Sequence, residues 1–146
     1  MYRYGSNGFS LIELIAIIVV LGVLAVVTAS QFVGNASAQL QASRDSIVAA
    51  LLSAQQLAMA QTDPVQVSVS GSSVDVRRDA GTGFGSINVG GVQYPLDISP
   101  VSLDGPTVTV GYDRLGRTLS GTDTSIPLKV GDSTVAVTVS PSGFSQ

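Results

Sequence analysis

The sequence contains no cysteine, no histidine and no tryptophan, and only 12% of its residues are charged. Without cysteine or histidine there is no disulfide, no thiolate or imidazole metal site and no Cys-His or Ser-His-Asp catalytic group. The net charge of -3 leaves no broad basic surface of the kind that binds nucleic acid. Carboxylates, hydroxyls and Lys129 remain for catalysis, so an enzyme would need a pair of aspartates brought together by folding, which is the weakest alternative. We expect a non-enzymatic protein without a cofactor, a metal, a small-molecule substrate or a nucleic-acid partner.

Proline and glycine are distributed unevenly along the 146 residues. All six prolines lie at or beyond Pro64, and most of the sixteen glycines lie at or beyond Gly71. Both residue types interrupt helices and favour turns. The part of the chain before Pro64 can therefore form a helix, whereas the part after it has the frequent turn-forming residues that are typical of a β-sheet.

A long apolar run lies near the start of the chain. From Phe9 to Ala29 the only charged residue is Glu13, and about twenty such residues are enough for a helix to cross a bilayer. Arg3 is the only charged side chain ahead of the run, which favours a cytoplasmic amino terminus. We expect a single transmembrane segment at about 9–29, with the rest of the chain on the outer side.

Two other interpretations of this run stay open. A cleaved secretory signal would use the small residues Ala36 and Ala38, but its apolar part is normally about 7 to 15 residues long and free of acids. A plain uncleaved anchor explains the apolar length but not the glutamate within it.

Glu13 is the only glutamate of the protein, and it stands among isoleucines and leucines. An acid at the centre of a membrane costs roughly 2.5 to 3.5 kcal/mol, and such residues usually have a partner. Cleavage after Gly8 would create an amino group on Phe9, on the same helical face as Glu13 and close to the positive end of the helix dipole. The cut would therefore supply a cation for this acid.

The residues Gly8, Phe9 and Glu13, followed by the apolar run, resemble the processing signal of type IV pilins and of type II secretion pseudopilins. The resemblance implies that a prepilin peptidase cuts between Gly8 and Phe9 and methylates the new terminus. It also implies that Glu13 of an incoming subunit pairs with the Phe9 amine of its neighbour. The partners implied are this peptidase, other pilin or pseudopilin subunits and an inner-membrane assembly platform.

The helical pattern continues beyond the apolar run. No proline occurs between Ser30 and Thr62, apolar residues recur at helical spacing, and Asp63-Pro64 ends the pattern. The stripe expected to face the core of a domain consists of Ile47, Val48, Leu51, Leu52 and Leu57. The predicted organisation is a leader at 1–8, a long helix at 9–62 and a β-rich head at 63–146.

Beyond Pro64 the apolar residues alternate with polar ones, as in half-buried strands. The predicted strands, joined in several places by turns that contain glycine, are 65–69, 74–77, 87–89, 92–94, 107–112, 125–130 and 134–140. The expected fold class is α+β, in which a long N-terminal helix, half transmembrane and half amphipathic, packs on an antiparallel β-sheet or small β-sandwich.

Three features of the predicted head have a functional and a local interpretation. Arg77-Arg78 could contact DNA, but two arginines beside aspartates more often form a solvated hairpin end. Arg114 and Arg117 either pair with acids of a neighbouring subunit or form ion pairs within their turn. The glycines of 81–85 suggest a phosphate loop but lack its strand-to-helix context, so we expect a flexible loop.

The end of the chain favours one branch of the family. Major pilins often close their C-terminal loop with a disulfide, which 141–146 cannot do, and the segment 135–144 resembles the ending of H-type pseudopilins and of minor pilins of the mannose-sensitive haemagglutinin pilus. The expected function is a minor pilin held in the bacterial inner membrane with its head in the periplasm and then assembled into a pilus. An H-type pseudopilin and a membrane-tethered monomeric binding module are the alternatives.

Overall fold

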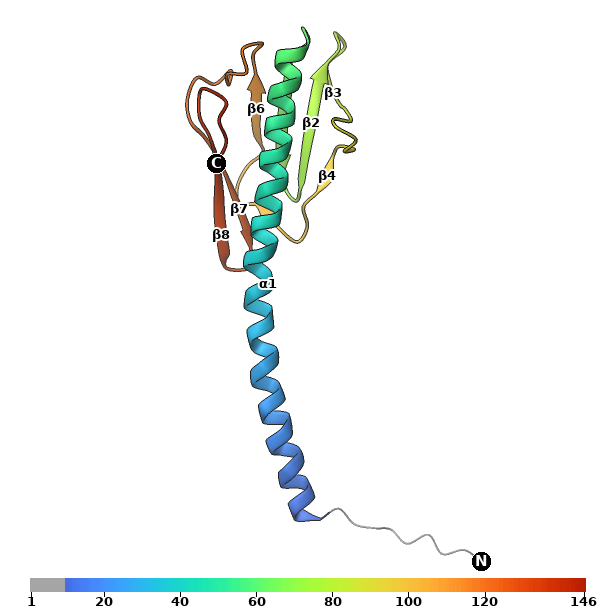
Figure 1. Ribbon diagram of the computed structural model, residues 1–146, viewed down its shortest axis with the longest axis vertical. Coiled ribbons are helices and arrows are strands. Elements are labelled where there is room, and N and C mark those ends of the chain that lie inside the picture. Colours follow the sequence, from blue (N-terminus) through green and yellow to red (C-terminus); the bar gives the residue numbers. More distant parts are fainter. Residues whose placement is uncertain (1–9) are drawn as a thin grey trace, which may run out of the picture. The chain divides into compact units, whose positions relative to one another are not determined.

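Figure 1 shows the computed structural model of the chain, which describes residues 10–146 without the side chains of 24–34. The internal contacts divide the chain into two units between Asn35 and Ala36. We call the second unit, Ala36–Gln146, the head. The expected leader at 1–8 and its cleavage site at Gly8 and Phe9 lie outside the described residues.

One helix, α1, runs from Leu11 to Ala60 and contributes residues to both units. It begins after Ser10, whose carbonyl accepts hydrogen bonds from the backbone N–H groups of Glu13 and Leu14 at 3.0 and 3.2 Å. It ends just before Asp63-Pro64, because proline disfavours helical geometry in the residue that precedes it. These bounds lie within two residues of the predicted ones at each end.

Within the part of the chain that the structure describes, no helix is both long enough and apolar enough to cross a membrane. The segment expected at about 9–29 includes Phe9 and the side chains of 24–29, which fall outside that part.

The head contains two antiparallel sheets. The larger has the order β3-β2-β1-β6, with β4 also paired to β2, and consists of β1 (Val65–Ser70), β2 (Ser73–Asp79), β3 (Phe84–Ser86), β4 (Leu96–Asp97) and β6 (Val108–Tyr112). The smaller has the order β5-β7-β8 and consists of β5 (Ser102–Leu103), β7 (Thr124–Val130) and β8 (Ser133–Val139). The sheets lie side by side, where the N–H of Leu103 donates to the carbonyl of Gly71 at 2.7 Å.

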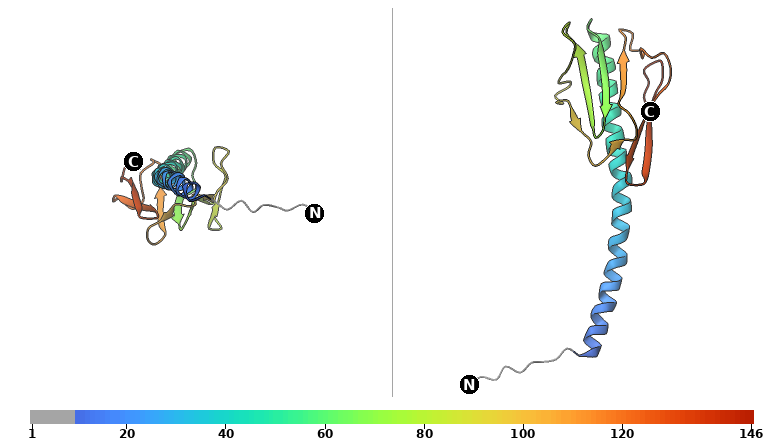
Figure 2. Two further views of the ribbon diagram at one scale, coloured as in Figure 1. Left: turned by 90° about the horizontal axis from the view of Figure 1, so that it is seen from below. Right: turned by 180° about the vertical axis from the view of Figure 1, so that it is seen from behind.

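The helix of the head lies across both sheets and shares one core with them (Figures 1 and 2). Ile47, Leu51 and Ala54 of α1 are completely buried, as are Val67 of β1 and Ile126 of β7. The alternation of β1 places every second residue in this core, as its period of two predicts. The antiparallel-sheet form of the predicted α+β class is therefore correct, and a face-to-face sandwich does not form.

Three details of the prediction are wrong. Leu52 is 43% exposed, because it lies on the other side of the helix from its neighbour Leu51. The predicted hairpin at 87–94 is reduced to a single bridge between Val89 and Val92. The loop expected at 81–85 instead leads into β3, which pairs with the end of β2. In these strands, the pairing available across the sheet outweighs local sequence preference.

The chain closes by folding its tail back against the end of β8. Thr138 and Gln146 exchange two backbone hydrogen bonds at 2.9 and 3.0 Å, and Gly143 lies in the turn between them with φ +87°. A Cβ at Gly143 would overlap the carbonyl oxygen of Gly116 and the side chain of Gln55. Only glycine satisfies both the backbone angle and the close approach here.

We predict that Gly143→Ala destabilises the protein more than Gly131→Ala. Gly131 also has a positive φ, at +56°, but a Cβ there would meet nothing within 4 Å. The control should lose about 1 kcal/mol from backbone strain alone, and Gly143→Ala about 3 kcal/mol because it adds overpacking. Urea unfolding of both variants measures the difference, and equal losses would contradict the close approach.

Candidate assembly surface

Glu13 lies in the first turn of α1, and its side chain is exposed. Side chains at spacings of three and four residues share its face of the helix and line a shallow groove with it, namely Ala16, Ile17, Val20 and Leu21. The carboxylate therefore stands at one end of an apolar stripe.

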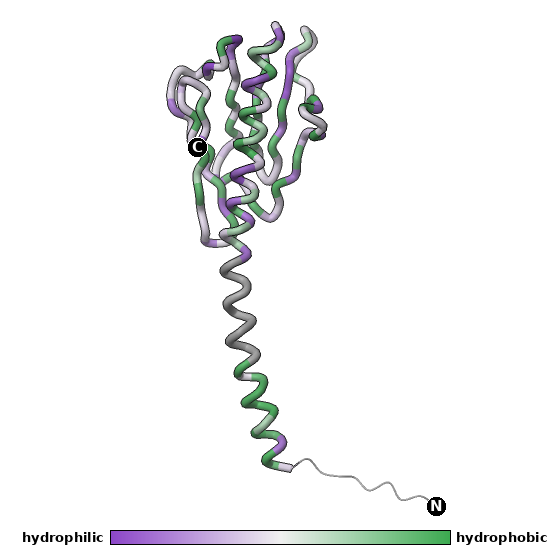
Figure 3. The backbone as a smooth tube through the Cα atoms, viewed as in Figure 1, coloured by the Kyte–Doolittle hydropathy of each residue, from purple (hydrophilic) through white to green (hydrophobic). Residues whose placement is uncertain are grey.

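The described N-terminal part of α1 consists mostly of hydrophobic residues, with the hydrophilic Glu13 near its start (Figure 3). Every residue from Leu11 to Val23 is exposed, including leucines, isoleucines and valines. A helix that is apolar all round is normally covered by lipid or by other helices. This segment is therefore a candidate for contact with a partner that the structure of the single chain does not contain.

The other predicted site residues, Gly8 and Phe9, lie outside the described residues. The structure therefore places Glu13 but does not bring it together with the Phe9 amine, and their pairing stays a prediction.

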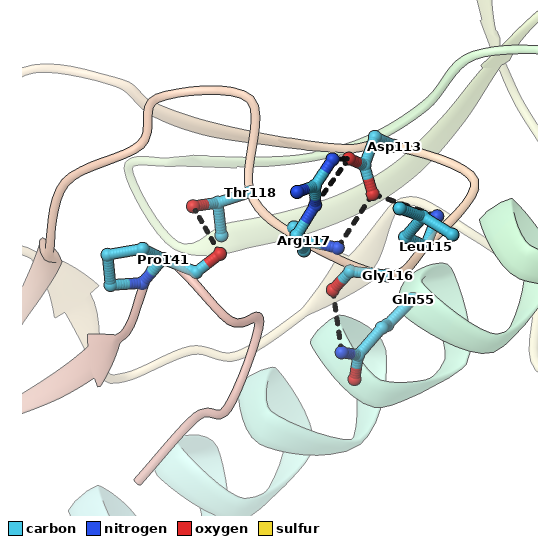
Figure 4. Close-up of polar contacts among 7 residues, drawn as sticks. All are labelled: Gln55, Asp113, Leu115, Gly116, Arg117, Thr118 and Pro141. Atoms are coloured by element: carbon cyan, nitrogen blue, oxygen red, sulfur yellow. Dashed lines mark hydrogen bonds and ion pairs between the residues drawn. The ribbon is translucent and has the colours of Figure 1, made fainter.

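A second candidate surface lies at the end of the head where α1 finishes. Asp113, just after β6, accepts hydrogen bonds on Oδ1 from the N–H groups of Leu115 and Arg117 at 2.9 and 2.8 Å (Figure 4). Its Oδ2 accepts from Nε of Arg117, also at 2.9 Å. The backbone N–H of Arg117 is the largest of the effects that hold the pKa of Asp113 below its ordinary value. The turn is thus fixed by its own aspartate.

This turn is attached to the helix and to the tail (Figure 4). Nε2 of Gln55 donates to the carbonyl of Gly116 at 2.7 Å, and the N–H of Thr118 donates to the carbonyl of Pro141 at 3.0 Å. Residues far apart in sequence therefore form one rigid end of the head.

A cleft of about 250 Å³ opens at the same end, between the last turn of α1 and β6. Its lining includes Pro64, Tyr112, Arg114 and Leu119. Tyr112 is only 2% exposed, and its hydroxyl has no hydrogen-bond partner among the described residues. Burial raises the pKa of Tyr112 to about 12.

The charged side chains of the head mostly pair with each other. The ion pairs, with N···O distances between 2.7 and 3.9 Å, are Arg44–Asp45, Arg77–Asp75, Arg78–Asp63, Arg117–Asp113 and Lys129–Asp104. Arg77, Arg78 and Arg117 therefore have acidic partners within the head, as the local interpretation expects. Among the described residues, Arg114 is the one cation without an ion pair.

No protein-family model matches the chain, and no curated protein matches it in sequence. Among solved structures, the chain is similar to the crystal structure of the type IV minor pilin FimU of Pseudomonas aeruginosa strain PAO1. The two share 14% sequence identity with a TM-score of 0.50, over 73% of this chain and 90% of that chain.

The chain has the fold of a type IV minor pilin. The predicted pilin-like α+β architecture is therefore confirmed at the level of the fold. The similar protein is described as a pilin and not as an enzyme, which agrees with the expectation of a non-catalytic protein.

Sequence reasoning did not identify Gln55, Gly116 and Gly143 as a connected group. Their contacts join the helix, the turn after β6 and the tail, and no spacing in the sequence indicates a contact across such separations. The turn at 113–117 could be predicted from the sequence, because aspartate and glycine at this spacing favour a turn.

We predict that Tyr112→Phe raises the stability of the protein by about 1 kcal/mol at neutral pH, because it removes a buried hydroxyl without a partner. The pKa of Tyr112 is about 12 in the folded protein and 10.0 as its reference value, so the unfolded phenol ionises first. Wild-type stability should therefore fall as the pH rises from 10.0 to about 12.

The variant should lack the part of this fall that comes from Tyr112. Urea unfolding of wild type and Tyr112→Phe at several pH values measures both effects. Identical pH profiles for wild type and Tyr112→Phe would contradict the assignment.

Proposed function

We propose that the protein is a minor pilin, made as a precursor and cut by a prepilin peptidase between Gly8 and Phe9. Before assembly, the helix anchors the subunit in the bacterial inner membrane with the head in the periplasm. An inner-membrane platform then adds the subunit to a type IV pilus together with other pilins. The observation that carries this proposal is the minor-pilin fold of a chain whose exposed apolar helix bears Glu13 in its first turn.

The exposed apolar surface supports burial of the helix in lipid first and among other helices later. Both environments are oily, so transfer between them gains little hydrophobic free energy and specifies no register. A carboxylate that meets an ammonium group does specify one, because each charge is poorly solvated until it finds the other. In this proposal Glu13 of one subunit pairs with the methylated Phe9 amine of its neighbour.

The segment 135–144 resembles the ending both of minor pilins of the mannose-sensitive haemagglutinin pilus and of H-type pseudopilins, and of the two we propose a pilus of the first type. An H-type pseudopilin of type II secretion is the alternative that shares the leader, the helix and the fold. Neighbouring genes for pilus or for secretion machinery would distinguish the two. A membrane-tethered monomeric module would keep the head but would not enter a filament.

We predict that the mature protein begins at Phe9. Amino-terminal sequencing and mass spectrometry of protein from cells that contain a prepilin peptidase test this directly. A terminus at Gln39 would indicate a secreted product, and Met1 a plain anchor; either result would refute processing as a prepilin. The variant Gly8→Ala provides the matched control, since it should leave the precursor uncut in the same cells.

We predict that Glu13→Leu leaves membrane association unchanged but lowers incorporation into filaments by more than about tenfold. An amine left unpaired in oily surroundings costs about 3–5 kcal/mol, and about 1.4 kcal/mol already corresponds to tenfold. The control Ile17→Leu lies on the same face of the helix and keeps its charge. Quantifying each variant in sheared filaments and in membranes measures the effect, and normal incorporation of Glu13→Leu would contradict the pairing.

A further inference from the structure

The hydroxyl group of Tyr112 is not used by the fold. Tyr112 is 2% exposed and lines the cleft at the end of α1, and its hydroxyl has no hydrogen-bond partner among the described residues. A buried polar group without a partner costs free energy, and such groups are rare in folded proteins. A phenylalanine would fill the same space without this cost, so the hydroxyl is a candidate contact for a ligand.

Arg114 is the second unused group of the same cleft. Its side chain is exposed, and within the described part of the chain its guanidinium has neither an ion pair nor a hydrogen bond. The adjacent Asp113 does not pair with it, because both carboxylate oxygens of Asp113 already accept hydrogen bonds from its own turn. A guanidinium presents its N–H groups in a planar fork that matches the two oxygens of a carboxylate.

The charges around the cleft favour an anion with a single negative charge. The acids that line it are Asp63 and Asp113, whose partners are Arg78 at 3.9 Å and Arg117 at 2.9 Å. Each acid is thus balanced by one arginine, and Arg114 remains as one excess positive charge. A phosphate monoester carries about 1.5 to 2 negative charges at neutral pH, so a carboxylate matches this excess better.

The rest of the cleft wall is largely apolar, and the space is small. Ala58, Pro64 and Leu119 line it, and its volume is about 250 Å³. Pockets for drug-sized ligands typically measure about 300–1,000 Å³. Leu119 is 67% exposed, so its side chain can move aside for a ligand without disturbing the buried core. The cleft therefore suits a molecule of a few carbon atoms with one charged end.

We propose that this cleft binds a small monocarboxylic acid that carries an apolar group. The carboxylate accepts hydrogen bonds from the guanidinium of Arg114 and the hydroxyl of Tyr112, while the apolar group contacts Pro64 and Leu119. The cost of the buried hydroxyl is then the cost of a binding site, because groups that serve function often lower stability. The site goes beyond the proposed function, since it lies on the head and requires neither Glu13 nor Phe9.

The first test uses the purified full-length protein in micelles of an uncharged detergent, with para-fluorobenzoate as the probe. Tyrosine labelled with carbon-13 at Cζ reports on the four tyrosines of the chain, and the Tyr112 signal is assigned by its loss in Tyr112→Phe. We expect the probe to shift the Tyr112 signal in a saturable way and to leave the Tyr94 signal in place. The uncharged para-fluorobenzamide should bind at least about tenfold more weakly, because hydrogen bonds between charged groups are the stronger ones.

Variants locate the carboxylate, with affinities measured from the fluorine NMR signal of the probe. Arg114→Gln removes the charge of an exposed side chain and should weaken binding at least about tenfold. Lys129→Gln is the matched control, since it removes one positive charge from β7 and should leave the affinity unchanged. Tyr112→Phe should bind about fivefold to tenfold more weakly even though we expect it to be the more stable protein.

Three results would each overturn the site: equal binding of the acid and the amide, an unchanged affinity in Arg114→Gln, or a Tyr112 signal that does not move as the probe is added. None of them bears on the proposed function, which depends on cleavage before Phe9 and on Glu13. Conversely, a precursor that stays uncut would refute the processing and leave the cleft as a binding site.

Discussion

The buried face of α1 in the head is the constraint on which the rest of the structure depends. Ile47 and Leu51 fill the space over the sheets, while Ala50 and Ala54 let the backbones approach closely, and all four are completely buried. Among the described residues, no element other than α1 covers this face of the strands. Removing the helix would expose the inner faces of both sheets at once, so the two sheets and the helix form one cooperative unit.

The head is closed without covalent bonds. Backbone pairing of Thr138 with Gln146, the donation from Gln55 to Gly116 and the close approach of Gly143 hold the last residues in place. Each such hydrogen bond contributes about 0.5–1.5 kcal/mol, so several together replace what one disulfide would supply. The rigid end that results also presents Arg114 and its apolar neighbours in a fixed arrangement.

The charged side chains of the two units differ in whether they have partners within the chain. In the head most cations have an acid within the same fold, as for Lys129 with Asp104 at 2.7 Å. The described N-terminal part of α1 has one charge, Glu13, and a surface of exposed leucine, isoleucine and valine. Pairing within the domain suits a surface that meets water, whereas an acid on an apolar surface usually has a partner.

The sequence alone determined the class of fold, the end of the helix at Asp63-Pro64 and most of the strands, because hydrophobic period and helix breakers are local properties. It also singled out Glu13, since an acid in an apolar run is visible without coordinates. It could not give the exposure of Leu52, the pairing of Phe84 in β3 or the meeting of Gln55, Gly116 and Gly143. Those features depend on which segments pack together, and only the tertiary structure decides that, because burial and close approach are set by residues distant in the chain.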